Sequence, residues 1–121
     1  MITKNQLAVS APNALSKKSI VYARKVIGYK MKIHIVPKYV LPFGYGLTLY
    51  KLILVRKDGD IPYLVAHETK HSLDWQEIGF FKFPYLYIKE CITKGYWANK
   101  YEVSAREYGR LNRDKYMEYM K

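Results

Sequence analysis

His67, Glu68 and His71 place two imidazoles and a carboxylate within about one helical turn, in the order His-Glu-Thr-Lys-His. On a helix, residues four apart lie on the same face, so both imidazoles can bind one zinc ion. Glu68 lies beside that pair and can accept a proton from a metal-bound water. Two ligands, an adjacent general base and an open metal position indicate zinc-assisted hydrolysis of a peptide bond.

A catalytic zinc ion needs a third protein ligand, and three acidic residues follow the motif: Asp74, Glu77 and Glu102. Asp74 lies about 60 degrees from His71 around the helix but nearly one turn further along, so it is better placed to receive the outer N–H of that ring. Glu77 lies about 240 degrees from His71 around the helix, so it could reach the same ion only if a glycine three residues after His71 turned the chain. Asp74 occupies that position, and Glu77 is therefore excluded as a ligand. Glu102 opens a separate predicted helix and is the best placed of the three.

The motif needs a helix and a small sheet to hold it. Asp60 and Pro62 predict a helix start, with Asp60 capping the first amides, and the helix should run from about residue 61 to 78 and end at Gly79. Alternating apolar residues predict a strand over residues 31–36 with His34 on its polar side, and an apolar run predicts a second strand over residues 47–56. The other predicted helices cover residues 17–27, residues 80–93 with an interruption near Pro84 and an end at Gly95, and about residues 100–120 after a cap at Asn99.

Around the motif, the chain resembles the thermolysin-type gluzincins, in which a Glu on a second helix follows His-Glu-x-x-His. It is also similar to small peptidase-like proteins of bacteria and their phages over roughly residues 44 to 109. The shared features are Gly46-Leu47-Thr48, Leu64-Val65-Ala66, Trp75-Gln76, Gly79-Phe80-Phe81 and the segment from Gly95-Tyr96 through Asn99 to Tyr101-Glu102.

This resemblance implies a zinc ion held by His67, His71 and Glu102, with Glu68 as the general base that later returns the proton to the leaving amine. It also favours Tyr96 as the donor to the developing oxyanion. Other candidates for that donor are Tyr101, Tyr108 and His34.

The chain departs from the gluzincin pattern at one position. Arg106 stands where many gluzincins have an Asp that orients a ligand His. Either Asp74 or Glu107 supplies that carboxylate here, or the site has none.

The 121 residues suffice for one domain with one core. We expect a loose arm over residues 1–15 and a single zincin-like metallopeptidase domain over residues 16–121. The expected fold class is α+β, with a sheet of two to three strands packed against the motif helix and the C-terminal helix. The sequence contains no apolar run long enough to cross a bilayer and no apolar leader after Met1, so a soluble protein is expected, in the cytoplasm or associated with a virion.

A formal net charge of +11 favours polyanionic partners such as nucleic acid or the cell envelope, although a solvated basic surface is the simpler interpretation. The leading hypothesis is a zinc peptidase acting on peptides or proteins, with cell-wall peptides as one conceivable substrate. The alternative is a basic binding or structural protein, such as a phage virion or nucleic-acid-associated component, whose metal only stabilises the fold. A role within a larger viral or secreted assembly is compatible with either hypothesis.

Overall fold

The computed structural model describes residues 22, 23, 25 and 32–119. Residues 22, 23 and 25 are helical, and the rest of the helix predicted over residues 17–27 lies outside the described residues. The arm predicted over residues 1–15 lies outside them as well.

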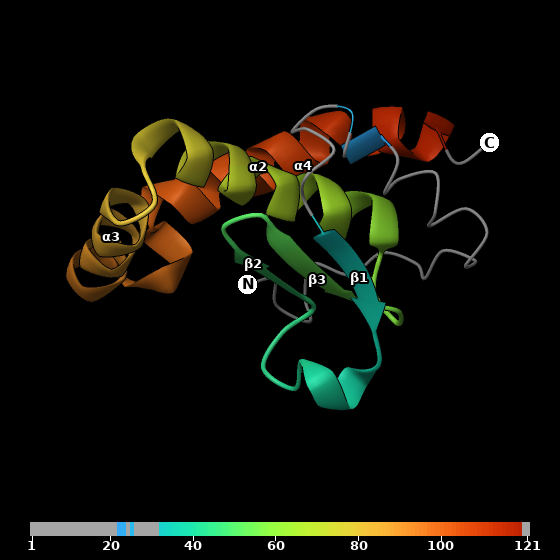
Figure 1. Cartoon of the computed structure of the whole chain (residues 1–121), viewed down its shortest axis with the longest axis horizontal. Helices are drawn as coiled ribbons and strands as arrows, with labels where there is room; N and C mark the ends of the chain where they lie inside the picture. Colours follow the sequence, from blue (N-terminus) through green and yellow to red (C-terminus); the bar gives the residue numbers. More distant parts are fainter. Residues whose placement is uncertain (1–21, 24, 26–31, 120–121) are drawn as a thin grey trace.

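Three strands form the sheet, in the order β1-β3-β2 (Figure 1). β3 pairs in parallel with β1 and antiparallel with β2, which leaves β2 at one edge of the sheet. The fold is therefore α+β, as the sequence predicted, with three strands in the described part of the chain. Their bounds are Lys32–Val36 for β1, Gly46–Leu49 for β2 and Leu52–Arg56 for β3, and the short 3-10 helix η2 (Lys38–Val40) lies between β1 and β2.

The single strand predicted over residues 47–56 is wrong, because the chain turns back at Tyr50 to form the β2–β3 hairpin. Tyr50 adopts a φ of 55°, a left-handed conformation that usually favours Gly or Asn. Tertiary contacts hold it there: its ring packs edge-on against Trp75 and Phe80, and its carbonyl accepts a hydrogen bond of 2.8 Å from Ser72.

Helix α2 spans Ile61–Ile78, the range predicted for the motif helix, and the chain leaves it at Gly79 with a φ of 131°. Pro62 lies in the first turn, where its missing N–H costs no helical hydrogen bond. Asp60 precedes the helix as expected, but its side chain does not cap it. The carboxylate instead accepts two hydrogen bonds, of 2.7 and 3.2 Å, from Arg113 at the far end of the chain.

Helix α3 spans Lys82–Ala98 and is longer than the helix predicted over residues 80–93. The predicted interruption at Pro84 is wrong because this residue lies in the first turn, where backbone N–H groups have no partner within the helix. The chain leaves the helical conformation at Gly95, the predicted end, where φ is 82°, and this kink separates the helix from the last residues of α3.

Helix α4 spans Lys100–Tyr119, and Asn99 caps it as predicted by accepting a hydrogen bond of 2.8 Å from the Tyr101 amide. α2 contacts β2 and β3 on one side and α4 on the other, while α3 lies at one end of the molecule (Figure 1). The core forms mainly between α2 and the sheet. Its buried members include Ile33, Ile53, Val55, Leu64, Val65, Ala66 and Tyr116. Within the described ranges, no helix combines the length and the apolar character that crossing a bilayer requires.

Candidate metal centre

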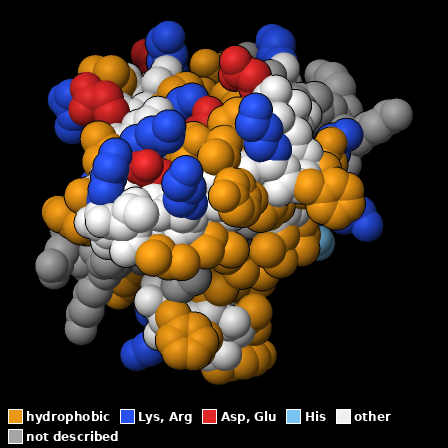
Figure 2. Space-filling view, turned by 90° about the vertical axis from the view of Figure 1, so that its left-hand side faces the viewer, with side chains coloured by type: hydrophobic (Ala, Val, Ile, Leu, Met, Phe, Trp, Pro, Cys, Tyr) orange, Lys and Arg blue, Asp and Glu red, His pale blue; other side chains and the backbone are white. Residues whose placement is uncertain are grey.

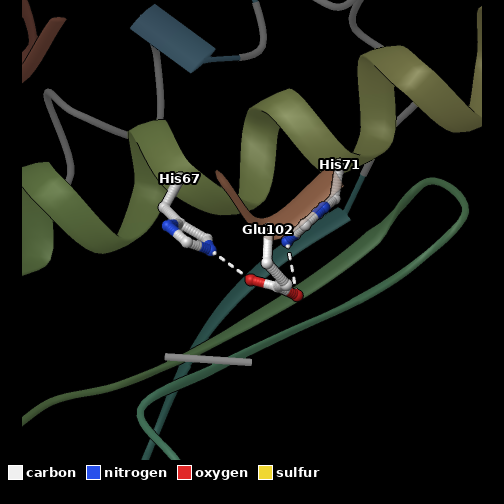
Figure 3. Close-up of side chains that lie close together, drawn as sticks. All are labelled: His67, His71 and Glu102. Carbon is white, nitrogen blue, oxygen red and sulfur yellow. Dashed lines mark hydrogen bonds and ion pairs between the residues drawn. The ribbon is translucent and has the colours of Figure 1, made fainter. Parts of the chain in front are cut away.

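His67 and His71 on α2 and Glu102 on α4 converge at one buried point (Figure 3). His67 Nε2 lies 3.1 Å from Glu102 Oε1, and His71 Nε2 lies 3.1 Å from Glu102 Oε2. One potential ligand atom from each side chain lies within 4.8 Å of the others, so this group could hold a metal ion. The three residues are those predicted as ligands, and no other such group occurs among the described residues.

The approach of α4 to α2 depends on Gly109. A Cβ atom at this position would lie 2.8 Å from Cε1 of Tyr63 and 3.4 Å from Cβ of His67, too close for any larger residue without displacement. Glu102 lies two turns earlier on the same helix, in its first turn, where exposed amide groups favour a carboxylate. The glycine and the Asn99 cap therefore set the position of Glu102 against the two histidines.

His71 buries both nitrogens of its ring beside the other two candidate ligands. Neither of its ring nitrogens forms a hydrogen bond with a described residue, and Nε2 lacks the alignment for one despite its 3.1 Å distance from Glu102. Buried polar atoms without partners are costly, and binding of a metal ion is one way in which proteins satisfy them. The ring therefore directs Nε2 toward the point that it shares with His67 and Glu102, without forming a hydrogen bond there.

Glu68 is fully buried beside the three candidate ligands without being one of them. Thr48 on β2 donates a hydrogen bond of 2.9 Å to Glu68 Oε1, whereas Oε2 accepts no hydrogen bond from a described residue and lies 3.9 Å from His67 Nε2. Gly46 leaves space for this carboxylate, since a Cβ atom there would lie 2.9 Å from Oε2. The sequence predicted Glu68 as a functional residue but did not identify its dependence on Gly46 and Thr48.

Three tyrosine hydroxyls surround the candidate ligands. Tyr87 donates a hydrogen bond to Glu102 Oε2, Tyr96 donates one of 3.2 Å to Glu102 Oε1, and the hydroxyl of Tyr63 lies 3.4 Å from His67 Nδ1. Burial, reinforced by the negative charge of Glu102, raises the pKa of Tyr87 and of Tyr96 far above neutrality, so both remain donors. Tyr96 was predicted at the site. Tyr63 and Tyr87 were missed, although Tyr63 stands one helical turn before His67 and that spacing could have identified it.

The acidic residues proposed to orient a ligand histidine do not do so. Asp74 pairs with Lys70 at 2.6 Å, and so does not receive the outer N–H of His71 as predicted. Glu107 pairs with Arg110 at 2.6 Å on the surface. Arg106, which replaces the usual gluzincin Asp, stacks over the Trp97 ring at 4.1 Å. Among the described residues, the Tyr63 hydroxyl therefore lies beside the outer nitrogen of His67, and no side chain forms a hydrogen bond with the outer nitrogen of His71.

The remaining candidates from the sequence lie elsewhere. Glu77 is exposed on α2, in agreement with its exclusion as a ligand, and His34 is exposed on β1. The Tyr101 ring packs against the Phe83 ring, and the Tyr108 hydroxyl forms a hydrogen bond with the Tyr116 hydroxyl.

The protonation states at the site suit metal binding. Burial would raise the pKa of Glu102, but its interactions with His67 and His71 outweigh burial and hold the pKa well below the usual range. Burial lowers the pKa of His67, and the bond to Glu102 only partly opposes this effect. An ionised carboxylate beside a neutral imidazole is the state in which both can donate electron pairs to a cation.

A pocket of about 260 Å³ opens beside the candidate ligands. Its polar lining comes from Thr48, Glu68, His71 and Glu102, and its apolar lining comes from Leu47, Trp75, Phe83, Pro84, Tyr87 and Ile88. The volume is below the roughly 300–1,000 Å³ typical of sites that enclose a whole small ligand. It therefore fits one side chain of a larger molecule.

Comparison of the chain with protein-family models, with curated proteins and with solved structures finds no match.

Proposed function

We propose that this protein is a zinc-dependent peptidase of the gluzincin type, in which His67, His71 and Glu102 bind zinc and Glu68 is the general base. The observation that supports this proposal most is the position of Glu68. It is a buried carboxylate next to three candidate ligands, and its Oε2 accepts no hydrogen bond from the described residues. A site that only stabilised the fold would have no use for such a group.

The ligand atoms fit zinc in type and spacing. Two imidazoles and one carboxylate are a set found in catalytic zinc sites, and three protein ligands leave one position open. Ligand atoms about 2.0–2.1 Å from a tetrahedral zinc ion lie roughly 3.3 Å from each other. Each His Nε2 lies 3.1 Å from one oxygen of Glu102, Oε1 for His67 and Oε2 for His71, and one potential ligand atom from each side chain lies within 4.8 Å of the others. Binding through Nε2 leaves the His67 Nδ1 proton facing the Tyr63 hydroxyl, which can accept it.

When bound, zinc would polarise a carbonyl group and lower the pKa of a water molecule at the site. Glu68 then accepts the proton of the attacking water through Oε2 and passes it to the leaving amine. Thr48 holds the other oxygen and so fixes the direction of the carboxylate. Tyr96 and Tyr87 remain protonated, and either hydroxyl can donate to a developing oxyanion once it exchanges its bond to Glu102.

The surroundings favour an extended peptide as substrate. Within the part of the chain that the structure describes, β2 has a strand partner on one side only, and two of its residues, Leu47 and Thr48, line the pocket. A peptide added to this edge by backbone hydrogen bonds could place one side chain in the pocket. The apolar lining favours a large apolar side chain there.

The decisive experiment replaces Glu68 with Gln. We expect Glu68→Gln to retain about one zinc ion per chain by elemental analysis and to lose at least about 100-fold in hydrolysis of unfolded casein or of an apolar fluorogenic peptide. Glu77→Gln is the matched control, because Glu77 is an exposed acid on the same helix, and it should keep wild-type activity. If the wild type takes up no zinc, or if Glu68→Gln hydrolyses as fast as the wild type, the peptidase proposal is wrong. The second of these results would favour a basic binding protein with a structural metal.

A further inference from the structure

Helix α3 carries an apolar stripe on its outer side. Phe81 directly precedes the helix, and Tyr85, Ile88 and Ile92 follow at positions within about 60 degrees of one another around its axis. Phe81 is 84% exposed and Ile92 is 80% exposed, and the other two side chains are more than half exposed. We call these four residues the α3 stripe. Figure 2 looks onto the end of the molecule that carries α3 and shows a broad band of apolar side chains on that face.

The α3 stripe is as large as the largest apolar patch on a typical monomer, a patch that often has a function. From its exposed fractions and aromatic areas of roughly 150–250 Å² per side chain, it presents on the order of 500 Å² of apolar surface. Contiguous apolar patches of more than a few hundred Å² on a soluble domain mark sites of association. The stripe therefore needs an occupant.

The charge around the stripe indicates that the occupant is anionic. Lys82 and Lys89 lie on α3 next to the stripe and are exposed. Glu90, the one acidic residue of α3, bonds to Lys94 and to the Lys100 amide instead of facing the stripe. The chain as a whole carries a formal net charge of +11.

A second copy of the chain fits this surface poorly. Two molecules with this charge repel each other. The apolar area is also smaller than the roughly 800 Å² per partner of a standard stable interface. Nucleic acid fits less well than a bilayer, because only Phe81 and Tyr85 offer a ring on which a base can stack, whereas the aliphatic Ile88 and Ile92 do not.

We propose that the α3 stripe binds the surface of an anionic lipid bilayer, with its apolar side chains inserted among the acyl chains and Lys82 and Lys89 at the headgroups. Helices with an apolar face and flanking lysines bind membrane surfaces in this way, lying in the plane of the interface. Ile88 belongs both to the stripe and to the lining of the pocket beside the metal centre. A bound bilayer therefore lies next to the entrance of that pocket. This inference goes beyond the proposed peptidase function and does not depend on it.

The test is flotation of the whole chain with vesicles. Wild-type protein should float with vesicles of mixed phosphatidylcholine and phosphatidylglycerol and should bind pure phosphatidylcholine vesicles at least about tenfold more weakly. The triple variant Phe81→Ser, Tyr85→Ser, Ile92→Ser should lose at least about tenfold in partitioning onto the anionic vesicles. Leu111→Ser is the control, since Leu111 is a 61% exposed apolar residue on α4 outside the stripe, and it should bind like the wild type.

Each alternative gives a distinct result. Wild-type protein that stays unbound with anionic vesicles overturns the proposal, and so does a triple variant that floats like the wild type, because charge alone would then explain binding. A wild-type dimer that becomes monomeric in the triple variant, with unchanged flotation, identifies a second copy as the occupant and also overturns it. Thermal unfolding by circular dichroism checks that the variants are folded. Glu68→Gln should float like the wild type, which separates this test from that of the peptidase.

Discussion

Replacing Thr48 with Val tests whether the orientation of Glu68 matters for the proposed chemistry. The Thr48 hydroxyl lies 2.9 Å from Glu68 Oε1 and 3.0 Å from the Glu68 carbonyl oxygen. Valine has nearly the same shape, so the substitution removes the hydroxyl and leaves the packing of β2 against α2 intact. The Glu68 carboxylate then has no hydrogen-bond donor among the described residues for either oxygen.

The size of the effect follows from the charge and the burial of Glu68. A hydrogen bond to a charged group contributes about 1.5–3 kcal/mol, and about 1.4 kcal/mol corresponds to a tenfold change in rate. If at least half of the free energy of this hydrogen bond holds the carboxylate in its catalytic orientation, its loss raises the activation barrier by about 1.4 kcal/mol. We therefore expect kcat to fall about tenfold. The free energy of unfolding should also fall, by about 1–2 kcal/mol, because a fully buried carboxylate loses a partner.

The assay compares kcat for an apolar peptide, zinc content and the thermal midpoint among three proteins: the wild type, Thr48→Val and Thr48→Ser. Serine retains the hydroxyl, so Thr48→Ser should have nearly wild-type kcat, and both variants should bind one zinc ion per chain. The reasoning is refuted if Thr48→Val keeps the wild-type kcat, or if Thr48→Ser loses as much activity as Thr48→Val.

Three further predictions concern the same centre. Gly46→Ala should lower kcat and leave zinc content unchanged, because its Cβ would lie 2.9 Å from Glu68 Oε2 and displace the carboxylate; wild-type activity would show that this close approach is irrelevant. Tyr87→Phe removes a donor to Glu102 and should weaken zinc binding about tenfold in a chelator competition assay, with unchanged affinity as the contrary result. Burial holds the pKa of His67 below its ordinary 6.5 in the folded protein. As pH falls below 6.5, the metal-free unfolded chain therefore binds more protons than the folded chain, and the folded state loses stability. The thermal midpoint of chelator-treated protein should therefore fall from pH 7 to pH 5, and should fall less in His67→Gln; a midpoint that rises with acidity would contradict this sign.

The sequence predicted the parts of the site that depend on spacing within one helix. The helix over residues 61–78 has the predicted bounds, because its apolar positions and its flanking Asp60 and Gly79 agree with one another. His67 and His71 follow from that helix alone. Glu102 was predicted as a ligand because it lies in the first turn of a separate helix that Asn99 caps, and because the chain resembles the gluzincins.

The features that were missed or wrong depend on contacts between elements. The hairpin turn at Tyr50 contains no residue typical of turns, so the sequence does not predict it. The conformation of Tyr50 is held instead by aromatic rings of α2 and of the following loop. Asp74 was expected to support His71, but Lys70 lies one turn away and is the stronger partner. Tyr87 could not be singled out among 13 tyrosines, because its bond to Glu102 exists only once α3 packs against α4.

X-ray absorption at the zinc edge of the zinc-loaded protein tests the central claim most directly. Coordination by His67, His71 and Glu102 predicts one zinc ion per chain, a shell of nitrogen and oxygen at about 2.0–2.1 Å, and the outer scattering of two imidazole rings. A protein that takes up no zinc, or a spectrum without imidazole scattering or with a sulfur neighbour at about 2.3 Å, would contradict it.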